Sequence, residues 1–255
     1  MTNTTINTNH TGVGASSRAF SRKRAARIAG VSYLVMFVLA IFANFVVREG
    51  LVEPGNPAAT VSNITESIGL FRLGLLSFVV IFLLDVVIAW ALHIVFRDVN
   101  RDVSLATAWF RLVYTVLLGV ALVSMFQVLQ ILGSSGFLGA LGADQVNSLT
   151  MTELASFEST WLIGLVAFGI HLVLLGWLIV RSGLASKVLG YVLIVAGIAY
   201  VLDTAAHGLL SDYESVASVF LVAVAVPSMV GEGWLGLWLL LTKRLPSCDT
   251  YPRSD

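Results

Sequence analysis

The sequence predicts an all-α integral membrane protein, a six-transmembrane-helix bundle with both termini in the cytoplasm. Three observations carry this prediction. The 255 residues are 57% hydrophobic and 12% charged, which is about half the charged fraction of soluble domains. Six apolar runs each reach the length of about 20 residues that crosses a bilayer. Lys and Arg gather in every second connection between these runs, as the positive-inside rule describes.

One membrane domain and two polar tails are expected. Residues 1–21 are rich in Thr, Asn, Ser and Gly, and we expect them to form a disordered cytoplasmic tail. Residues 22–244 form the six-helix transmembrane domain, and residues 245–255 form a cytoplasmic C-terminal tail. The predicted spans are about 28–47, 72–96, 105–132, 158–180, 188–209 and 216–242.

The first span follows a basic cluster, Arg18 to Arg27, in the order of a signal peptide. Its apolar run is long and lacks a small-x-small cleavage site, so we expect a retained helix. Twelve of the 15 Lys and Arg residues lie in the two terminal segments and the short turns after spans 2 and 4, whereas the outer loops hold only Arg48. The short turns join spans 2 and 3, and spans 4 and 5, into hairpins. The outer loops, 48–71 and 133–157, have room for short interfacial helices.

Composition excludes several function classes. The net charge is zero, which gives no pull toward nucleic acid. A single cysteine, Cys248, allows no internal disulfide. His93, His171 and His207 lie at different depths, and the sequence has no H-E-x-x-H, Walker or G-x-S-x-G motif. No metal, cofactor or catalytic residue is therefore predicted.

Four ionisable residues should meet near the middle of the membrane. At a rise of about 1.5 Å per residue, Asp85, Arg111, His171 and Glu232 lie about 13–18 Å from the cytoplasmic boundary. We call these four the inner polar cluster. Asp85 and Arg111, on neighbouring helices, should form an ion pair, which serves either structure or function. Glu232 then shares Arg111, pairs with a protonated His171, or stays protonated.

A second group should lie nearer the outer face. Asp203 and His207 share one face of span 5, within reach of Arg72 and Glu158; Arg72, Asp203 and His207 are called the outer polar cluster. In span 6, Pro227, Gly231 and Gly233 predict a kinked or loosened helix beside Glu232, because proline cannot donate to the carbonyl four residues before it.

Several short motifs together point to a known family. They are Arg24-Ala-Ala-Arg-Ile-Ala-Gly30, Phe71-Arg-Leu-Gly74, Leu84-Asp85, Phe110-Arg111, Trp177-Leu-Ile-Val-Arg181-Ser-Gly, Tyr200 with Asp203, and Pro227-x4-Glu232. Over about residues 22–243 the chain resembles the bacterial family known as domain of unknown function 4386. The resemblance implies a six-span protein of the bacterial inner membrane and gives weight to Arg72, Asp85, Arg111 and Glu232. It supplies no substrate, and the Thr- and Asn-rich start lies outside it.

Three hypotheses for function follow from these residues. The first is a small-solute or ion permease, proton-linked through Glu232, since transporters place binding sites at helix breaks near the midplane. The second is a structural or sensory membrane protein whose polar core fixes helix packing. The third, least favoured, is an intramembrane enzyme acting on a lipid or quinone. The expected partners are the lipid bilayer and a small solute or proton, with a homo-oligomer left open.

Overall fold

A computed structural model describes residues 21–133 and 141–242, and this part of the chain is almost entirely helical, with no β-strand. Six of its helices are long and apolar enough to cross a bilayer. The predicted fold class, an all-α protein with six membrane-length helices, is therefore confirmed. Apart from Ser21, the two predicted tails lie outside the described residues, and so does Cys248 in the second of them.

The first span is a compound helix. Its α-helical part, α1 (Arg22–Ile41), continues into a π-helical stretch (Phe42–Arg48) and the short α2 (Glu49–Leu51). The loop after it carries α3 (Pro57–Glu66), and a 3-10 turn (Tyr213–Ser215) joins the last two spans. The other five spans are α4 (Ile68–Phe96), α5 (Arg101–Gly133), α6 (Ala143–Ser182), α7 (Lys187–Leu209) and α8 (Ala217–Leu241).

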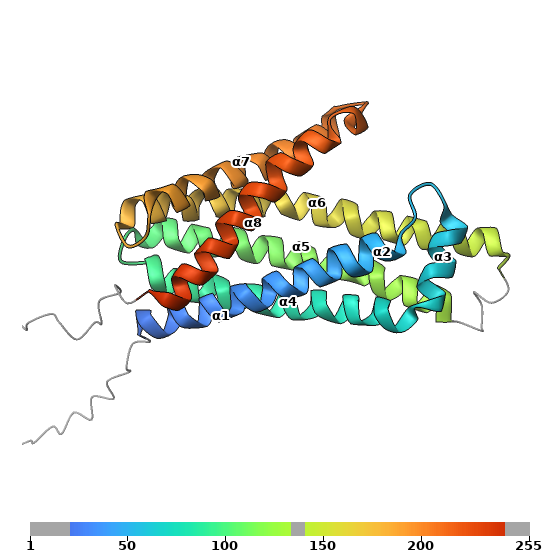
Figure 1. The fold of residues 1–255 in the computed structure, drawn as a ribbon, viewed down its shortest axis with the longest axis horizontal. Coiled ribbons are helices and arrows are strands. Elements are labelled where there is room, and N and C mark those ends of the chain that lie inside the picture. Colours follow the sequence, from blue (N-terminus) through green and yellow to red (C-terminus); the bar gives the residue numbers. More distant parts are fainter. Residues whose placement is uncertain (1–20, 134–140, 243–255) are drawn as a thin grey trace, which may run out of the picture.

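The six spans form a ring in which each helix contacts the next. The order around the ring is α1, α4, α5, α6, α7 and α8, and α8 returns to α1. The start of α1, the end of α8 and the short α4–α5 and α6–α7 turns lie at one end of the bundle, which we call the terminal end (Figure 1). The opposite end, with α3 and the α7–α8 turn, is called the loop end. Side chains that point inward from this ring meet at its centre.

The ring is closed unevenly between α1 and α8. Toward the terminal end the two backbones touch: a Cβ atom on Gly30 would lie 2.9 Å from the carbonyl oxygen of Gly236. The buried residues of α8 begin at Ser228, and none of residues 217–227, all of them described, is buried. The loop ends of α7 and α8 project away from the other helices (Figure 1). Helix α8 therefore packs tightly on α1 near the terminal end, whereas its half nearer the loop end has no buried residue.

Glycines allow α6 and α7 to lie in backbone contact. A Cβ atom on Gly169 would lie 2.5 Å from the carbonyl oxygen of Gly197, and Gly176 and Gly190 approach each other in the same way. Such pairs of small residues are a common means of close helix packing in membranes. Two facing pairs of glycines therefore bring the backbones of α6 and α7 into direct contact.

Helix α6 corrects the prediction of a loop at 133–157. It begins at Ala143 and has 40 residues, so it extends about 60 Å, twice the thickness of the hydrocarbon core. In its polar first turns, serine hydroxyl groups bond to backbone carbonyls of the same helix. Ser148 donates to the carbonyl of Asp144 at 2.8 Å, and Ser156 donates to that of Thr152 at 2.8 Å.

Span 6 is not unwound at the predicted break, and a kink at Pro227 stays a prediction. Helix α8 runs from Ala217 to Leu241 with Pro227 inside it, and Gly231 and Gly233 are helical too. Proline removes one backbone hydrogen bond, which a long helix can tolerate. The hydroxyl of Ser228, directly beside the proline, donates to the carbonyls of residues 224 and 225, at 2.7 and 3.2 Å.

Candidate functional site

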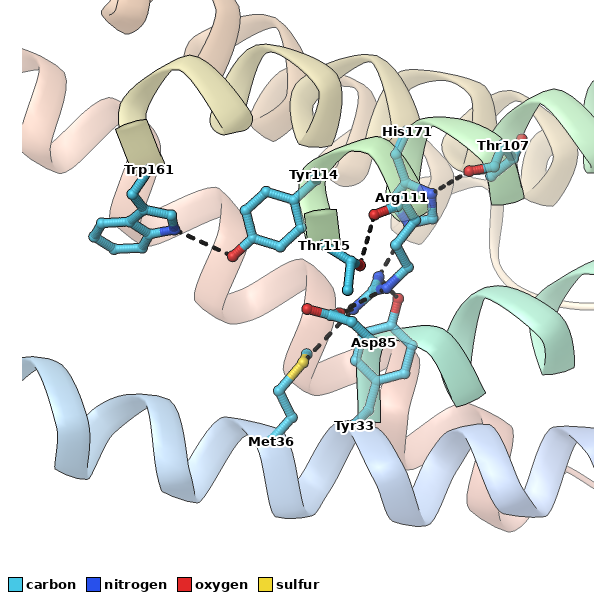
Figure 2. Close-up of polar contacts among 9 residues, drawn as sticks. All are labelled: Tyr33, Met36, Asp85, Thr107, Arg111, Tyr114, Thr115, Trp161 and His171. Carbon is cyan, nitrogen blue, oxygen red and sulfur yellow. Dashed lines mark hydrogen bonds and ion pairs between the residues drawn. The ribbon is translucent and has the colours of Figure 1, made fainter. Parts of the chain in front are cut away.

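Arg111 is the centre of a buried polar network in the interior of the ring. Its side chain is fully buried, and its Nε and Nη2 donate to Oδ1 of Asp85 at 2.9 and 2.5 Å. Its Nη1 lies 2.8 Å from the Tyr33 hydroxyl and 3.1 Å from Nε2 of His171 (Figure 2). Four helices, α1, α4, α5 and α6, therefore meet through one guanidinium group. The predicted Asp85–Arg111 ion pair is present.

The contacts of His171 define its protonation. A guanidinium group can only donate, so Nε2 of His171 must accept from Arg111. The other ring nitrogen, Nδ1, lies 2.8 Å from the backbone oxygen of Thr107 and must carry the hydrogen. This arrangement is the neutral Nδ1–H tautomer with both nitrogens bonded. A protonated His171, one of the three partners expected for Glu232, does not fit these contacts.

Asp85 has one oxygen that is left over. The residue is 1% exposed, and both of its hydrogen bonds with Arg111 use Oδ1. Its Oδ2 is buried and has no hydrogen-bond partner among the described residues. Figure 2 shows one carboxylate oxygen directed away from the guanidinium group. An unsatisfied buried acceptor typically costs about 1–3 kcal/mol, more when it is charged, so a missing donor is the simplest reading of this geometry.

In the view of Figure 2, the ring of Tyr114 lies between Trp161 and the Asp85–Arg111 pair. Its hydroxyl accepts from Nε1 of Trp161 at 3.2 Å (Figure 2). It interacts electrostatically with Asp85, and its ring packs on that of Phe168 with centroids 4.8 Å apart. The hydroxyl hydrogen of Tyr114 has no acceptor among the hydrogen bonds of the described residues, so a donor as well as an acceptor is unused here.

Glu232 lies beside the network without joining it. It is half-buried on α8 and interacts electrostatically with Arg111 and Asp85. Among the residues that the structure describes, it has neither a hydrogen bond nor an ion pair within 4 Å. Of the inner polar cluster, Asp85, Arg111 and His171 are thus bonded together, and Glu232 is a neighbour with its carboxyl group unbonded.

The outer polar cluster is only partly assembled. Oδ1 of Asp203 accepts a hydrogen bond from the Tyr213 hydroxyl at 2.7 Å and lies 3.7 Å from Nδ1 of His207. The rings of His207 and Tyr213 have centroids 3.4 Å apart. Burial, followed by the hydrogen bond to the Asp203 carboxylate, raises the pKa of Tyr213. These three residues connect the loop end of α7 to the turn before α8.

Arg72 does not join Asp203 and His207. It is exposed on α4, and it has no ion pair with any residue in the described ranges. Arg48 instead pairs with Glu158 at 3.3 Å and lies over the ring of Trp161, 5.4 Å from its centroid. This ion pair at the loop end therefore joins the π-helical stretch of the first span to α6, and not α4 to α7.

The described residues contain no group of three or more His, Cys, Asp or Glu side chains close enough to hold a metal ion. His93 lies near the terminal end, where its Nδ1 is 3.2 Å from the Ser104 hydroxyl. His171 and His207 are bonded within their separate clusters, as described above.

Two bonding partners in this network, the Tyr33 hydroxyl for Arg111 and the Thr107 carbonyl for His171, could be found from sequence only in part. Tyr33 shares the inward face of span 1 with Phe37 and Ala40, so its face was readable, but its contact with Arg111 was not. The carbonyl of Thr107 gives no sequence signal, because any residue supplies a backbone oxygen. The Tyr114–Trp161 pair links two adjacent helices and depends on their rotation, which composition does not define.

Comparison with known proteins places the chain in a family. The sequence matches the family described as "Domain of unknown function (DUF4386)" over residues 28–242, which includes the whole inner polar cluster. The chain belongs to the DUF4386 family. An uncharacterized protein of Archaeoglobus fulgidus is similar to this DUF4386 protein, with 27% identity over 164 residues, or 64% of this chain and 80% of the relative. No solved structure matches the chain. The family resemblance of the sequence motifs is confirmed.

Proposed function

We propose that this DUF4386 protein is a small-solute permease that exchanges protons at Glu232. The observation that carries the proposal is the charge of the inner polar cluster. It contains two carboxyl groups, Asp85 and Glu232, and one guanidinium group, Arg111, while the contacts of His171 leave that ring neutral. A net charge inside a membrane is costly, so Glu232 must be accompanied by a proton or by a cation. Proton-linked exchange requires a carboxyl group that releases its proton when a cation binds and regains it when the cation leaves.

The position of the cluster supports the same proposal. Glu232 lies about 14 Å along α8 from the terminal end, near the middle of the span. Burial of α8 starts at Ser228, just on the loop-end side of Glu232. A polar site near the midplane, with the helices packed tightly on one side of it, resembles one state of an alternating-access carrier. Because α8 is continuous, the proposal does not depend on an unwound helix.

We infer that the terminal end faces the cytoplasm of a bacterial inner membrane. The basic side chains of the short turns, Arg97, Arg101, Arg181 and Lys187, all lie at this end. The natural Cys248 permits a direct test in inverted and right-side-out vesicles with a membrane-impermeant maleimide. We expect labelling only in inverted vesicles, and the opposite result for a variant with Cys248→Ser and Ser62→Cys on α3. Labelling of Cys248 in right-side-out vesicles would contradict the orientation.

The test of proton exchange does not require a known substrate. Proteoliposomes adsorbed on a solid-supported membrane are given rapid pH jumps between pH 5 and 9, and the transient current from proton binding is recorded. We expect a current in wild type, none in Glu232→Gln, and an unchanged current in Glu158→Gln, the matched control on α6. A wild-type current equal to that of empty liposomes, or one that survives in Glu232→Gln, would refute the role of Glu232.

One observation favours a second candidate, a structural membrane protein. Arg111 bonds to three other helices and is fully buried, as expected of a group that fixes helix register. Under this candidate, every substitution in the inner polar cluster changes function only as far as it changes stability. Measuring the pH-jump current and the unfolding free energy on the same variants separates the two candidates.

A further inference from the structure

The unbonded oxygen of Asp85 indicates the chemical class of ligand that the site would bind. It is the one acceptor of the inner polar cluster that is both fully buried and without a donor among the described residues. Arg111 cannot supply that donor, because its five N–H groups are already directed at Oδ1 from Nε and Nη2, at Tyr33 and His171 from Nη1, and at Sδ of Met36 from Nη2. Buried carboxylate oxygens are almost always bonded, so a donor from outside the chain is required.

The charge around Asp85 favours a cationic donor. Arg111 balances one of the two carboxyl groups, which leaves the second, Glu232, for a bound cation. A metal ion is a poor candidate, because no three metal-binding side chains gather within the described residues. An ammonium group places N–H donors and a full charge at a single oxygen, so it suits a lone Oδ2.

The walls of the site also suit a small organic cation. The rings of Tyr33 and Phe168 lie over the guanidinium group of Arg111, 5.0 and 5.4 Å from its central carbon, and the ring of Tyr114 packs on that of Phe168. Aromatic faces attract cations, and they exclude large hydrated ions by their bulk. Trp161 holds the hydroxyl of Tyr114 through its Nε1–H, which donates to it at 3.2 Å.

We propose that Oδ2 of Asp85 binds the protonated amino group of a small amine, with the Tyr114 hydroxyl as its neighbouring polar contact. This assignment deepens the proposed function and rests on it for the identity of the site. Exchange is neutral: one ammonium group enters as Glu232 loses one proton, and the total charge of the interior stays constant. The half-buried Glu232 marks the more exposed side of the cluster and is the group that an incoming cation meets before the fully buried Asp85.

Binding is tested on the purified full chain in detergent, with methylammonium chloride as the probe. Calorimetry at pH 8 measures heat, and a pH indicator measures released protons. Sodium chloride controls for salt, and tetramethylammonium chloride controls for a cation without N–H donors. We expect saturable binding of methylammonium alone, with release of about one proton that is lost in Glu232→Gln. Loss of one hydrogen bond in Tyr114→Phe should weaken binding about three- to tenfold. The exposed Tyr191→Phe on α7 is its matched control and should bind as wild type does.

The outcomes separate this inference from the proposed function. No saturable methylammonium binding to folded wild type, or an equal response to tetramethylammonium, overturns the inference and leaves Oδ2 to a bound water. Unchanged affinity in Tyr114→Phe overturns the assignment of Tyr114. A pH-jump current without amine binding refutes the ligand class alone, whereas amine binding without proton release or current refutes exchange at Glu232 and retains the ligand site. Asp85→Asn should abolish binding, and its melting curve reports whether it is folded.

Discussion

Replacement of Arg111 by methionine tests how much of the fold depends on the buried ion pair. Arg111 and Asp85 are 0% and 1% exposed as side chains, so solvent cannot compensate a lone charge at this position. Removing one partner of such a pair typically costs about 3–5 kcal/mol, because the other charge stays buried and unpaired. Arg111→Met should therefore lower the free energy of unfolding by about 3–5 kcal/mol, with loss of the contacts to Tyr33 and His171 included.

The double variant is the decisive measurement. Arg111→Met combined with Asp85→Leu removes both charges and fills the space with apolar atoms, which is often neutral in buried pairs. We expect it to recover to within about 1 kcal/mol of wild type. Unfolding is followed by circular dichroism as dodecyl sulfate is titrated into dodecyl maltoside micelles.

A partly exposed pair supplies the control. Arg48→Met breaks the ion pair with Glu158, whose side chains are 24% and 65% exposed, and should cost less than about 1 kcal/mol. An Arg111→Met variant within about 1 kcal/mol of wild type would refute the reasoning. So would a double variant as unstable as the single one, because the cost would then come from lost packing.

The remaining predictions concern three other regions. Glu232→Gln should melt at or above the wild-type temperature from pH 5 to 9 in scanning fluorimetry, since functional residues are often kept at a cost in stability; a fall of many degrees at every pH would make Glu232 a packing residue. Gly197→Ala should cost about 1–3 kcal/mol, because its Cβ meets backbone atoms of α6, whereas Gly208→Ala, in open space, should cost nothing; equal effects would contradict the glycine contact. Tyr213→Phe should cost about 1 kcal/mol through the lost hydrogen bond to Asp203. Because the pKa of Tyr213 is raised in the folded protein, this contribution is present below the unfolded pKa of about 10 and is lost as pH rises through the folded value, so a variant difference that stays constant from pH 7 to pH 11 would contradict it.

The inner polar cluster was largely predictable because depth along a helix can be counted. Asp85, Arg111 and His171 were expected at one level from a constant rise per residue, and they bond to one another there. The ion pair followed from a short turn between adjacent spans, which leaves neighbours little choice of register. Protonation of His171 was not predictable, since it depends on one backbone carbonyl of another helix.

Rotation about the helix axis was harder to predict than depth. Arg72 follows Phe71 directly, so the two side chains diverge by about 100° around α4. Phe71 and Gly74 are buried, and this rotation exposes Arg72. A single arginine in an apolar stretch is expected to point into the protein interior. The packing of its larger and smaller neighbours nevertheless determines which way its side chain points.

The proline in α8 shows why a composition signal can mislead. Pro227, Gly231 and Gly233 each weaken a helix in isolation, and their clustering favoured an unwound segment. In the bundle, Gly231 packs against Leu193 of α7, where the absence of a side chain permits close contact. The small residues near the proline therefore allow close packing. Without the position of α7, the sequence could not distinguish this packing role from an unwound segment.

The contact between Gly30 and Gly236 gives α8 the mechanics of a lever. The helix is clamped to α1 at that point, and from Ser228 to its start at Ala217 it extends for about 16 Å without a buried side chain. A tilt of about 20° about the clamp would displace the start of α8, about 28 Å from the clamp, by about 10 Å. Because Glu232 lies only about 6 Å from the clamp, a small displacement of α8 there, on gain or loss of a proton, is multiplied several-fold at the start of the helix.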